Sequence, residues 1–462
     1  MPTGPQPLEE TLLIGWLKKN YKEIEFIDKK LDYEAHDRTK KLVEAIQNLD
    51  ENKNLFDQKS AAVDVWRSLI GKAIVYLKYK DDREKYHDDE DYGVERLEEF
   101  IVAFSQFEPL LYGAEEGYRD HMCHMLSVFL VGDYLIRTML GGFGEIRVSD
   151  IEVIESQVSP NEKEAMWCII SLAHDLGIAL EKIPNINPKV EGMLKKFGSV
   201  DMQRLSYPFV RLPMDDFTVN FVSSDLRELP STGKEREFIT HVQSKYLLKF
   251  SEAYERRDHG IVSCLVLMKN LVFFLETDYT VDTRKPLDLE DAKQFLVRRN
   301  ILRAIASHSN DNIYYLKVIE FPFILRICDE LHERERPRLI EMFEGEKINR
   351  VVTVEDFSHA TIHYKVTFEL RTGIELEGDK KEELRDEVRA YFNGKCERIR
   401  RILRSALGGE DRQLSLTLEV VDNLEIPPSV YKLIHKTPED IKITIDDKDI
   451  SWLGLVEQLR KA

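Results

Sequence analysis

The segment WCIISLAHDLG, from Trp167 to Gly177, tells more about this chain than any other. Its first part is apolar and predicts a buried helix, which ends in adjacent His174 and Asp175 with a glycine two residues later. A buried aspartate is costly unless it is paired or bound to a metal. A polar helix C-terminus is the alternative, although neither histidine nor aspartate is a usual residue before such a glycine. We therefore expect His174 and Asp175 to belong to a site inside a helical core.

Other titratable residues lie in apolar, helix-like segments on both sides of this one. His121 and His124 are three residues apart, so they share one face of a helix. A single histidine on an apolar face is more often a hydrogen-bonded core residue than a ligand. Imidazoles and carboxylates that converge from separate helices, however, form a cage for one or two divalent metals. The candidate metal ligands are His124, His174, Asp175, His259, His308 and Asp329.

The composition predicts a globular intracellular protein. The chain has 462 residues, of which 43% are hydrophobic and 32% are charged, so we expect two or three domains. The net charge of −18 argues against a broad nucleic-acid-binding surface. It leaves room for a small phosphorylated substrate, because a bound metal reverses the local field. The odd number of scattered cysteines predicts reduced core thiols. No signal-like segment and no apolar run of membrane-span length is seen, so we expect a cytoplasmic protein with no membrane partner.

Changes of pattern divide the chain into three expected regions. Residues 1–94 predict a helical N-terminal extension, which ends in a charge-dense stretch at 78–91. Residues 95–349 show a long helical pattern. Proline and glycine predict interruptions of this pattern near residues 141–142, 184–188 and 208–230.

Residues 350–462 differ, and they predict a small α+β domain. One amphipathic helix is expected at 380–407. Alternating apolar residues predict strands at 351–354, 361–370, 414–421 and 441–445. The expected fold class is therefore mainly α, with a helical core and a small C-terminal α+β domain.

The order of five short motifs resembles the HD superfamily of metal-dependent phosphohydrolases over about residues 115–335. These motifs are His124-x-x-x-Val128, LAHDLG at 172–177, DHGIVSC at 258–264, AIASH at 304–308 and LRICDEL at 325–331. The resemblance implies a helical HD domain within 95–349. It also implies that His124, the His174–Asp175 pair and Asp329 bind one metal. Family members that carry both later histidines, here His259 and His308, commonly bind two metals bridged by the aspartate. The chain lacks the Gly-Tyr-Pro element of the cyclic-dinucleotide branch.

The same resemblance implies hydrolysis of a phosphoester or phosphoanhydride by metal-activated water, in a nucleotide or a related small molecule. A mixed imidazole and carboxylate site favours Fe, Mn, Zn, Co or Ni over Ca. Many binuclear members have a lysine soon after the His-Asp-x-Gly motif, where this chain has Ile178; Lys182 is the substitute one turn later. The candidate catalytic residues are Asp175, His259, His308 and Lys182. The candidate phosphate-binding residues are His121, Arg257, Arg303 and Arg326, for each of which core packing or a salt bridge is the alternative.

Three other functions stay open from the sequence. The fold can act as a nucleotide sensor that binds its ligand without turnover, with the C-terminal domain passing the signal to a partner. The histidines could instead belong to a helical interaction module that binds no metal. The resemblance also includes a di-iron oxygenase branch with the same ligand types. The sequence leaves homo-oligomerisation open as well.

Overall fold

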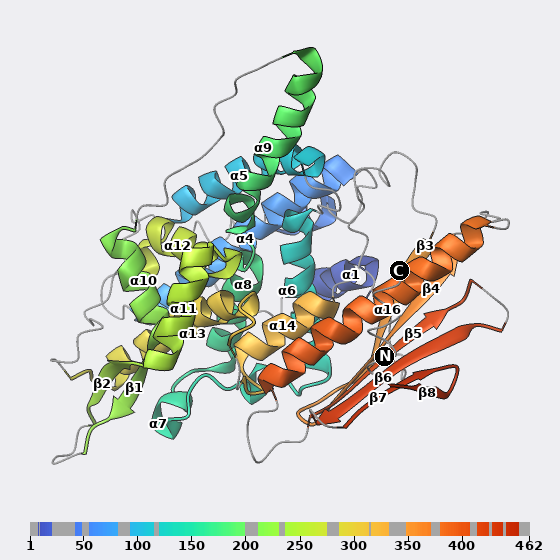
Figure 1. Cartoon of the computed structure of the whole chain (residues 1–462). Helices are drawn as coiled ribbons and strands as arrows, with labels where there is room; N and C mark the ends of the chain where they lie inside the picture. Colours follow the sequence, from blue (N-terminus) through green and yellow to red (C-terminus); the bar gives the residue numbers. More distant parts are fainter. Residues whose placement is uncertain are drawn as a thin grey trace.

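The computed structural model describes residues 8, 10–20, 42–48, 55–81, 93–114, 120–198, 211–230, 236–274, 286–313, 316–331, 348–370, 379–406, 414–424, 427–437 and 440–451. Part of the charge-dense stretch at 78–91 lies outside these residues. The described chain forms a group of helices followed by a six-stranded sheet that one long helix accompanies (Figure 1). This confirms the expected fold class.

The helical part contains two short strands besides its helices. Its α-helices are α1 (Glu10–Asn20), α4 (Leu55–Asp81), α5 (Val94–Ala114), α6 (His121–Thr138), α7 (Glu152–Glu155), α8 (Pro160–Ala173), α9 (Ile178–Leu194), α10 (Pro213–Ser223), α11 (Ser244–Arg256), α12 (His259–Asn270), α13 (Leu289–His308) and α14 (Phe321–Leu331). The strands are β1 (Ser224–Glu228) and β2 (Phe238–Val242), and short 3₁₀ turns follow at Phe143–Glu145, Lys195–Phe197 and Val272–Phe274.

Helix α8 lies at the centre of the helical part. It begins with a capping box between Ser159 and Glu162, and nearly all of its later residues are buried. Gly132 on α6 makes room for the Trp167 ring of α8, since an added Cβ would lie 2.0 Å from that ring. The indole of Trp66 on α4 donates to the carbonyl of Leu172, 2.5 Å away, near the end of α8. Helix α8 is therefore held by α4 of the N-terminal region and by α6 of its own region.

The N-terminal helices share the core of the later ones. Helix α4 packs against α8 and α6, and its Trp66, Leu69 and Ile70 are fully buried. The indole of Trp16 on α1 donates to the Asp133 carboxylate of α6 at 2.9 Å. The expected boundary near residue 95 stays a prediction, but these contacts make α1 and α4 part of the scaffold that positions the site.

Two local features differ from the expected helical pattern. Strands β1 and β2 form an antiparallel ribbon between α10 and α11. Helix α9 continues through Pro184 and Pro188, where an interruption was expected. Both prolines are exposed, so their rings lie on the outer side of the helix.

The C-terminal sheet has the strand order β3-β4-β5-β6-β7-β8. Only β4 and β5 pair in parallel, and α16 (Asp379–Ala406) connects them. The strands are β3 (Ile348–Phe357), β4 (Thr361–Leu370), β5 (Ser415–Asp422), β6 (Ser429–Thr437), β7 (Asp440–Ile445) and β8 (Lys448–Ile450). The helix and four of these strands lie where the sequence predicts them, whereas β6 and β8 were not predicted.

Two further expectations concern the whole chain. All five cysteines are free thiols, and four of them are buried, as the sequence predicts. Among the described helices, none has both the length and the apolar character that a membrane span requires.

Candidate metal centre

The six predicted ligands come from the ends of five helices. His124 lies in the first turn of α6, His259 begins α12, and His308 is the last residue of α13. His174 and Asp175 form the turn that follows α8, and Asp329 lies in the last turn of α14. Side chains at helix ends can point into one common space without another turn of backbone in the way. The structure brings the four histidines and Asp175 together there.

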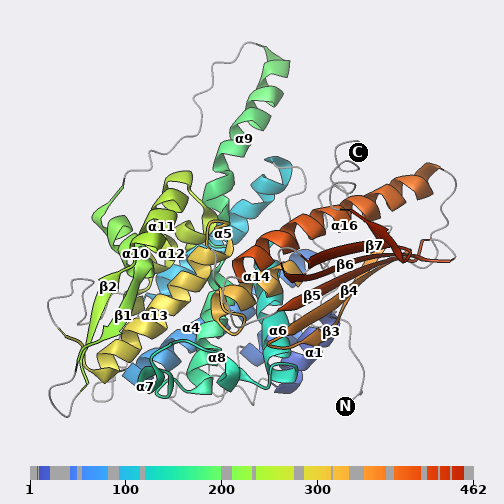
Figure 2. The same ribbon diagram turned by 60° about the horizontal axis from the view of Figure 1, so that its bottom comes forward.

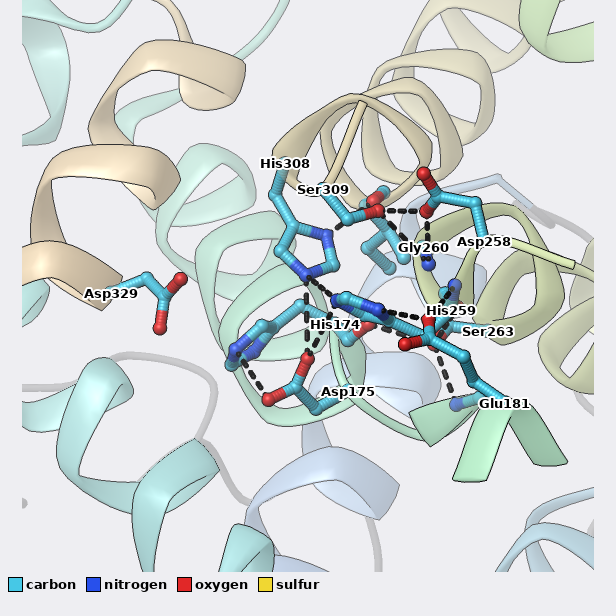
Figure 3. Close-up of polar contacts among 12 residues, drawn as sticks. His174, Asp175, Glu181, Asp258, His259, Gly260, Ser263, His308, Ser309 and Asp329 are labelled. Carbon is cyan, nitrogen blue, oxygen red and sulfur yellow. Dashed lines mark hydrogen bonds and ion pairs between the residues drawn. The ribbon is translucent and has the colours of Figure 1, made fainter. Parts of the chain in front are cut away.

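Two glycines allow the ligand-bearing segments to approach closely. A Cβ at Gly177 would lie 2.4 Å from the carbonyl oxygen of His259, and one at Gly260 would lie 2.7 Å from that of Ile305. Ser263 joins the same segments, because its hydroxyl donates to the His174 carbonyl at 2.7 Å and accepts from the Gly177 N–H at 2.8 Å. Gly177 and Ser263 therefore let the turn with His174 and Asp175 lie against the start of α12. Gly260 lets the start of α12 lie against the end of α13, which carries His308 (Figure 3).

The imidazoles of His174 and His308 have fixed orientations. The Nδ1 atom of His174 lies 2.8 Å from the Ser171 carbonyl, and that of His308 lies 2.6 Å from the Ile305 carbonyl. A carbonyl can only accept, so each Nδ1 carries the proton and each Nε2 presents its lone pair to the centre. Each carbonyl is three residues before its histidine, in the last turn of the same helix.

His259 is oriented by a different group, which no sequence motif indicates. It begins its helix and so has no preceding helical turn to supply a carbonyl. The Glu181 carboxylate on α9 accepts from its Nδ1 at 2.7 Å and from its backbone N–H at 3.0 Å. Glu181 follows Asp175 by six residues, in the charged segment that also contains Lys182. A carboxylate partner makes the imidazole a more basic metal ligand.

One face of the centre is a triangle of Asp175 Oδ1, His259 Nε2 and His308 Nε2. The two nitrogens are 3.1 Å apart, and they lie 3.5 and 3.3 Å from the oxygen, respectively. Two ligands at adjacent positions around one ion are separated by about 3.0–3.5 Å when each bond is about 2.1 Å long. Two imidazole lone pairs that face each other repel unless a proton or a metal cation lies between them. The donor set and its spacing therefore fit a divalent metal.

The other face contains His124, His174 and the second oxygen of Asp175. Oδ2 lies 3.4 Å from His174 Nε2 and 3.6 Å from His124 Nε2. These three donors also lie within 4.8 Å of one another, so one ion could contact all three. Asp329 adjoins this face, with its Oδ1 2.8 Å from His124 Nε2, and it approaches from a separate helix (Figure 3). Asp175 thus belongs to two adjoining groups, one through each oxygen.

The electrostatics of the centre favour a cation. Burial alone would raise the pKa of Asp175, but the facing imidazoles of His174, His308 and His259 hold it well below its usual range. Burial would lower the pKa of His259, yet the carboxylates of Glu181 and Asp175 raise it to about 9. Burial lowers the pKa of His174, which keeps this ring neutral and able to act as a ligand.

His121 lies beside the centre, and a buried carboxylate anchors it. Its ring centroid is 6.3 Å from that of His124, and its backbone N–H donates to Glu108 at 2.7 Å. Glu108 is fully buried and forms an ion pair with Lys59, which also lies 3.0 Å from Asp120, the N-cap of α6. Glu108 and Lys59 therefore hold the start of the helix that carries His121 and His124. Neither residue stands out in the sequence, because Lys59 lies on α4 and Glu108 on α5, far from His121 along the chain.

The other predicted residues have contacts of several kinds. Lys182 lies 3.6 Å from the Glu181 carboxylate. Arg303 donates to the carbonyls of Val222 and Ser224, and Arg326 donates to those of Ser307 and Asn310. Both arginines are buried, so these contacts favour a structural role over the expected phosphate contact. Arg257 ends α11 in the left-handed conformation, directly before Asp258 and His259, and its assignment stays a prediction.

Comparison with known proteins adds no relative. No protein-family model, no curated protein and no solved structure matches the chain. The structure therefore gives a helical core with buried histidine and aspartate groups that could hold metal, of a kind compatible with an HD-type site.

Proposed function

We propose that this chain is a metal-dependent phosphohydrolase of the HD type, acting on a phosphoester or phosphoanhydride of a nucleotide or a related small molecule. The observation that carries the proposal is the position of Asp175, whose two oxygens face two separate groups of imidazoles. A carboxylate placed in this way suits two metals that share it. Such pairs are typical of enzymes that cleave phosphate esters.

The metals would be held by residues of different exposure. His124, His174 and His308 are almost completely buried, whereas 21% of the His259 side chain and 38% of the Asp329 side chain are exposed. The substrate would therefore approach from the side of His259 and Asp329. When bound, the metal pair supplies an activated water and a positive clamp for phosphoryl oxygens. The nitrogen and oxygen donors favour Fe, Mn, Zn, Co or Ni.

The side chains around the metals would hold them in place and bind the substrate. Asp175, His259 and His308 hold the centre, and Glu181 keeps the His259 Nε2 lone pair directed at it. Among the predicted phosphate-binding residues, His121 is the one whose ring lies beside a candidate ligand, so it is our choice for contacting the substrate. Lys182 would attract the phosphate from the edge of the site.

The first test is metal content per chain by elemental analysis of protein purified without chelator. We expect about two metals in the wild type and none in Asp175→Ala, because this change removes a donor from both groups. Asp216→Ala, which changes an exposed carboxylate on α10, should keep both metals. A wild type that binds no metal even after reconstitution would contradict the proposal and support the alternative of a helical interaction module.

A second test separates an enzyme from a nucleotide sensor. The metal-loaded protein is incubated with a panel of nucleotides and phosphate esters, and released phosphate is measured. Turnover that Asp175→Ala abolishes supports the hydrolase. Binding of a nucleotide without any product supports the sensor, and oxygen consumption with an organic substrate would support the oxygenase branch.

A further inference from the structure

Helix α16 of the C-terminal α+β domain contacts the two segments that carry Asp329 and His308. In both views α16 lies along the sheet with one part beside α14 (Figures 1 and 2). Lys395 of α16 contacts Glu330, the residue after Asp329. Arg401, further along α16, lies 3.4 Å from Asp311, three residues after His308. The sheet domain is therefore attached to the helical part next to the candidate metal site.

The contact between Lys395 and Glu330 is buried and bidentate. The Lys395 ammonium donates to the Glu330 carbonyl at 2.9 Å and to its carboxylate at 2.5 Å. Only 5% of the Lys395 side chain and 11% of the Glu330 side chain are exposed. Buried ion pairs of this kind add little net stability, because desolvation offsets most of the attraction. Their contribution lies in fixing one arrangement of the two segments.

The segment that this pair fixes is the C-terminal end of α14. The carbonyl of Glu330 lies in the last turn, where helical carbonyls have no N–H partner within the helix. A lysine that donates there also interacts favourably with the negative end of the helix dipole. Asp329 is the most exposed of the candidate ligands, so its position depends mainly on the backbone of this turn. Its Oδ1 lies 2.8 Å from His124 Nε2, so it can add a further ligand to the group formed by His124, His174 and Asp175.

We propose that Lys395 is a positioning residue for the metal site, contributed by the α+β domain, which holds Asp329 in place through the backbone and side chain of Glu330. The inference rests on the proposed metal site. It gives the C-terminal domain a role at the site: movement of α16 changes the position of Asp329, and with it the affinity of the His124 and His174 group for metal. The group formed by Asp175, His259 and His308 does not include Asp329, so it keeps its metal.

The test measures Zn²⁺ binding by each variant in a metal–chelator buffer, with elemental analysis of the equilibrated protein. The Lys395→Met variant is expected to bind one zinc with wild-type affinity and the other about 10–100-fold more weakly. Lys395→Arg keeps donors for the Glu330 carbonyl and carboxylate, so it should restore binding of both ions. A double variant, Lys395→Met with Glu330→Met, removes the pair without leaving a buried carboxylate unpaired, and its folding is checked by circular dichroism.

The control is Lys293→Met. Lys293 is another buried lysine paired with a buried glutamate, Glu162, at 2.9 Å, but it lies near the start of α13, roughly 22 Å along the helix from His308. It should leave both zinc affinities unchanged. If the folded double variant binds two zinc ions as tightly as the wild type, or if Lys293→Met weakens one ion equally, Lys395 has no positioning role. A wild type that binds no zinc would instead overturn the proposed function, and this inference with it.

Discussion

At the scale of single residues, Glu181 distinguishes His259 from the other candidate ligands. His174 and His308 end their helices and use carbonyls of the preceding turn. His259 begins its helix and uses the Glu181 carboxylate instead. Because a charged acceptor increases the basicity of the imidazole, the metal bound by His259 and His308 should be the tighter of the two.

We expect Glu181→Gln to weaken this metal without unfolding the protein. The glutamine oxygen can still accept from Nδ1, but it is neutral, so the His259 ring becomes a poorer donor to the metal. The affinity of one ion should fall about tenfold, which chelator competition with Zn²⁺ would measure. Glu191→Gln is the control, because Glu191 pairs with Lys195 at the far end of the same helix. Equal effects of the two substitutions would show that charge on α9, and not the hydrogen bond to His259, controls affinity.

The candidate ligands are easier to recognise in the sequence than the groups that support them. His174 and Asp175 stand out because polar side chains are costly in an apolar helix. Glu181 looks like an ordinary surface residue, since it lies next to Lys182 in a charged segment. Arg303 and Arg326 fit a phosphate-binding hypothesis by charge alone, but the direction of a long side chain depends on tertiary packing. The structure directs both to backbone carbonyls.

At the scale of elements, the site depends on how closely the turn after α8 approaches α12. Gly177 has an ordinary helical conformation, with φ of −80°, so its lack of a side chain is needed for space. The nearest atoms are the His259 carbonyl and the Ser263 backbone nitrogen, at 2.4 and 2.8 Å from an added Cβ. Backbone atoms of a packed helix cannot move aside as the end of a flexible side chain can.

Gly177→Ala should therefore push α12 away from the turn. We expect a loss of about 1–3 kcal/mol in unfolding free energy and fewer bound metals, because His259 moves away from Asp175. Gly192→Ala, in α9, meets nothing within 4 Å and should be neutral or stabilise by about 0.5–1 kcal/mol. Urea unfolding and elemental analysis of both variants test the pair. If both variants keep wild-type stability and metal content, close approach at Gly177 is not required.

The sequence predicted elements best where the apolar pattern is regular. Strand β4 alternates buried Ile362, Tyr364, Val366 and Phe368 with partly exposed residues, and it was predicted over its whole length. The sequence predicts a break of helix α9 at Pro184 and Pro188, because it does not show that both prolines lie on the exposed side of a helix that continues. The β1–β2 ribbon is not predicted because each strand has only five residues and β1 is largely polar.

At the scale of the whole molecule, buried charged residues link the N-terminal helix α1 to the core helices α6 and α8. Trp16 of α1 and Arg137 of α6 both donate to Asp133, and Arg137 also pairs with Glu164 of α8. One guanidinium is thus shared by two buried carboxylates. Burial raises the pKa of Asp133, and burial together with the charge of Asp133 raises the pKa of Glu164 to about 8. The sequence could not reveal this cluster, since its members come from three separate segments.

This cluster should make the stability of the whole fold depend on pH. A carboxyl whose pKa is raised in the folded protein contributes stability at low pH, and this contribution is lost as the pH rises through the folded value. Between about pH 4.5 and pH 8 the Glu164 carboxyl is ionised in the unfolded chain but still protonated in the folded protein, so the unfolding free energy should fall by up to about 1.4 kcal/mol per pH unit. Glu164→Gln cannot ionise, so its stability should change less over this range and exceed that of the wild type at pH 8. Urea unfolding at several pH values measures both slopes, with Glu152→Gln on the exposed face of α7 as the control. If the unfolding free energies of the wild type and Glu164→Gln change with pH in parallel, Glu164 is ionised in the folded protein. Arg137 then keeps both carboxylates ionised, and the cluster is a network of ion pairs.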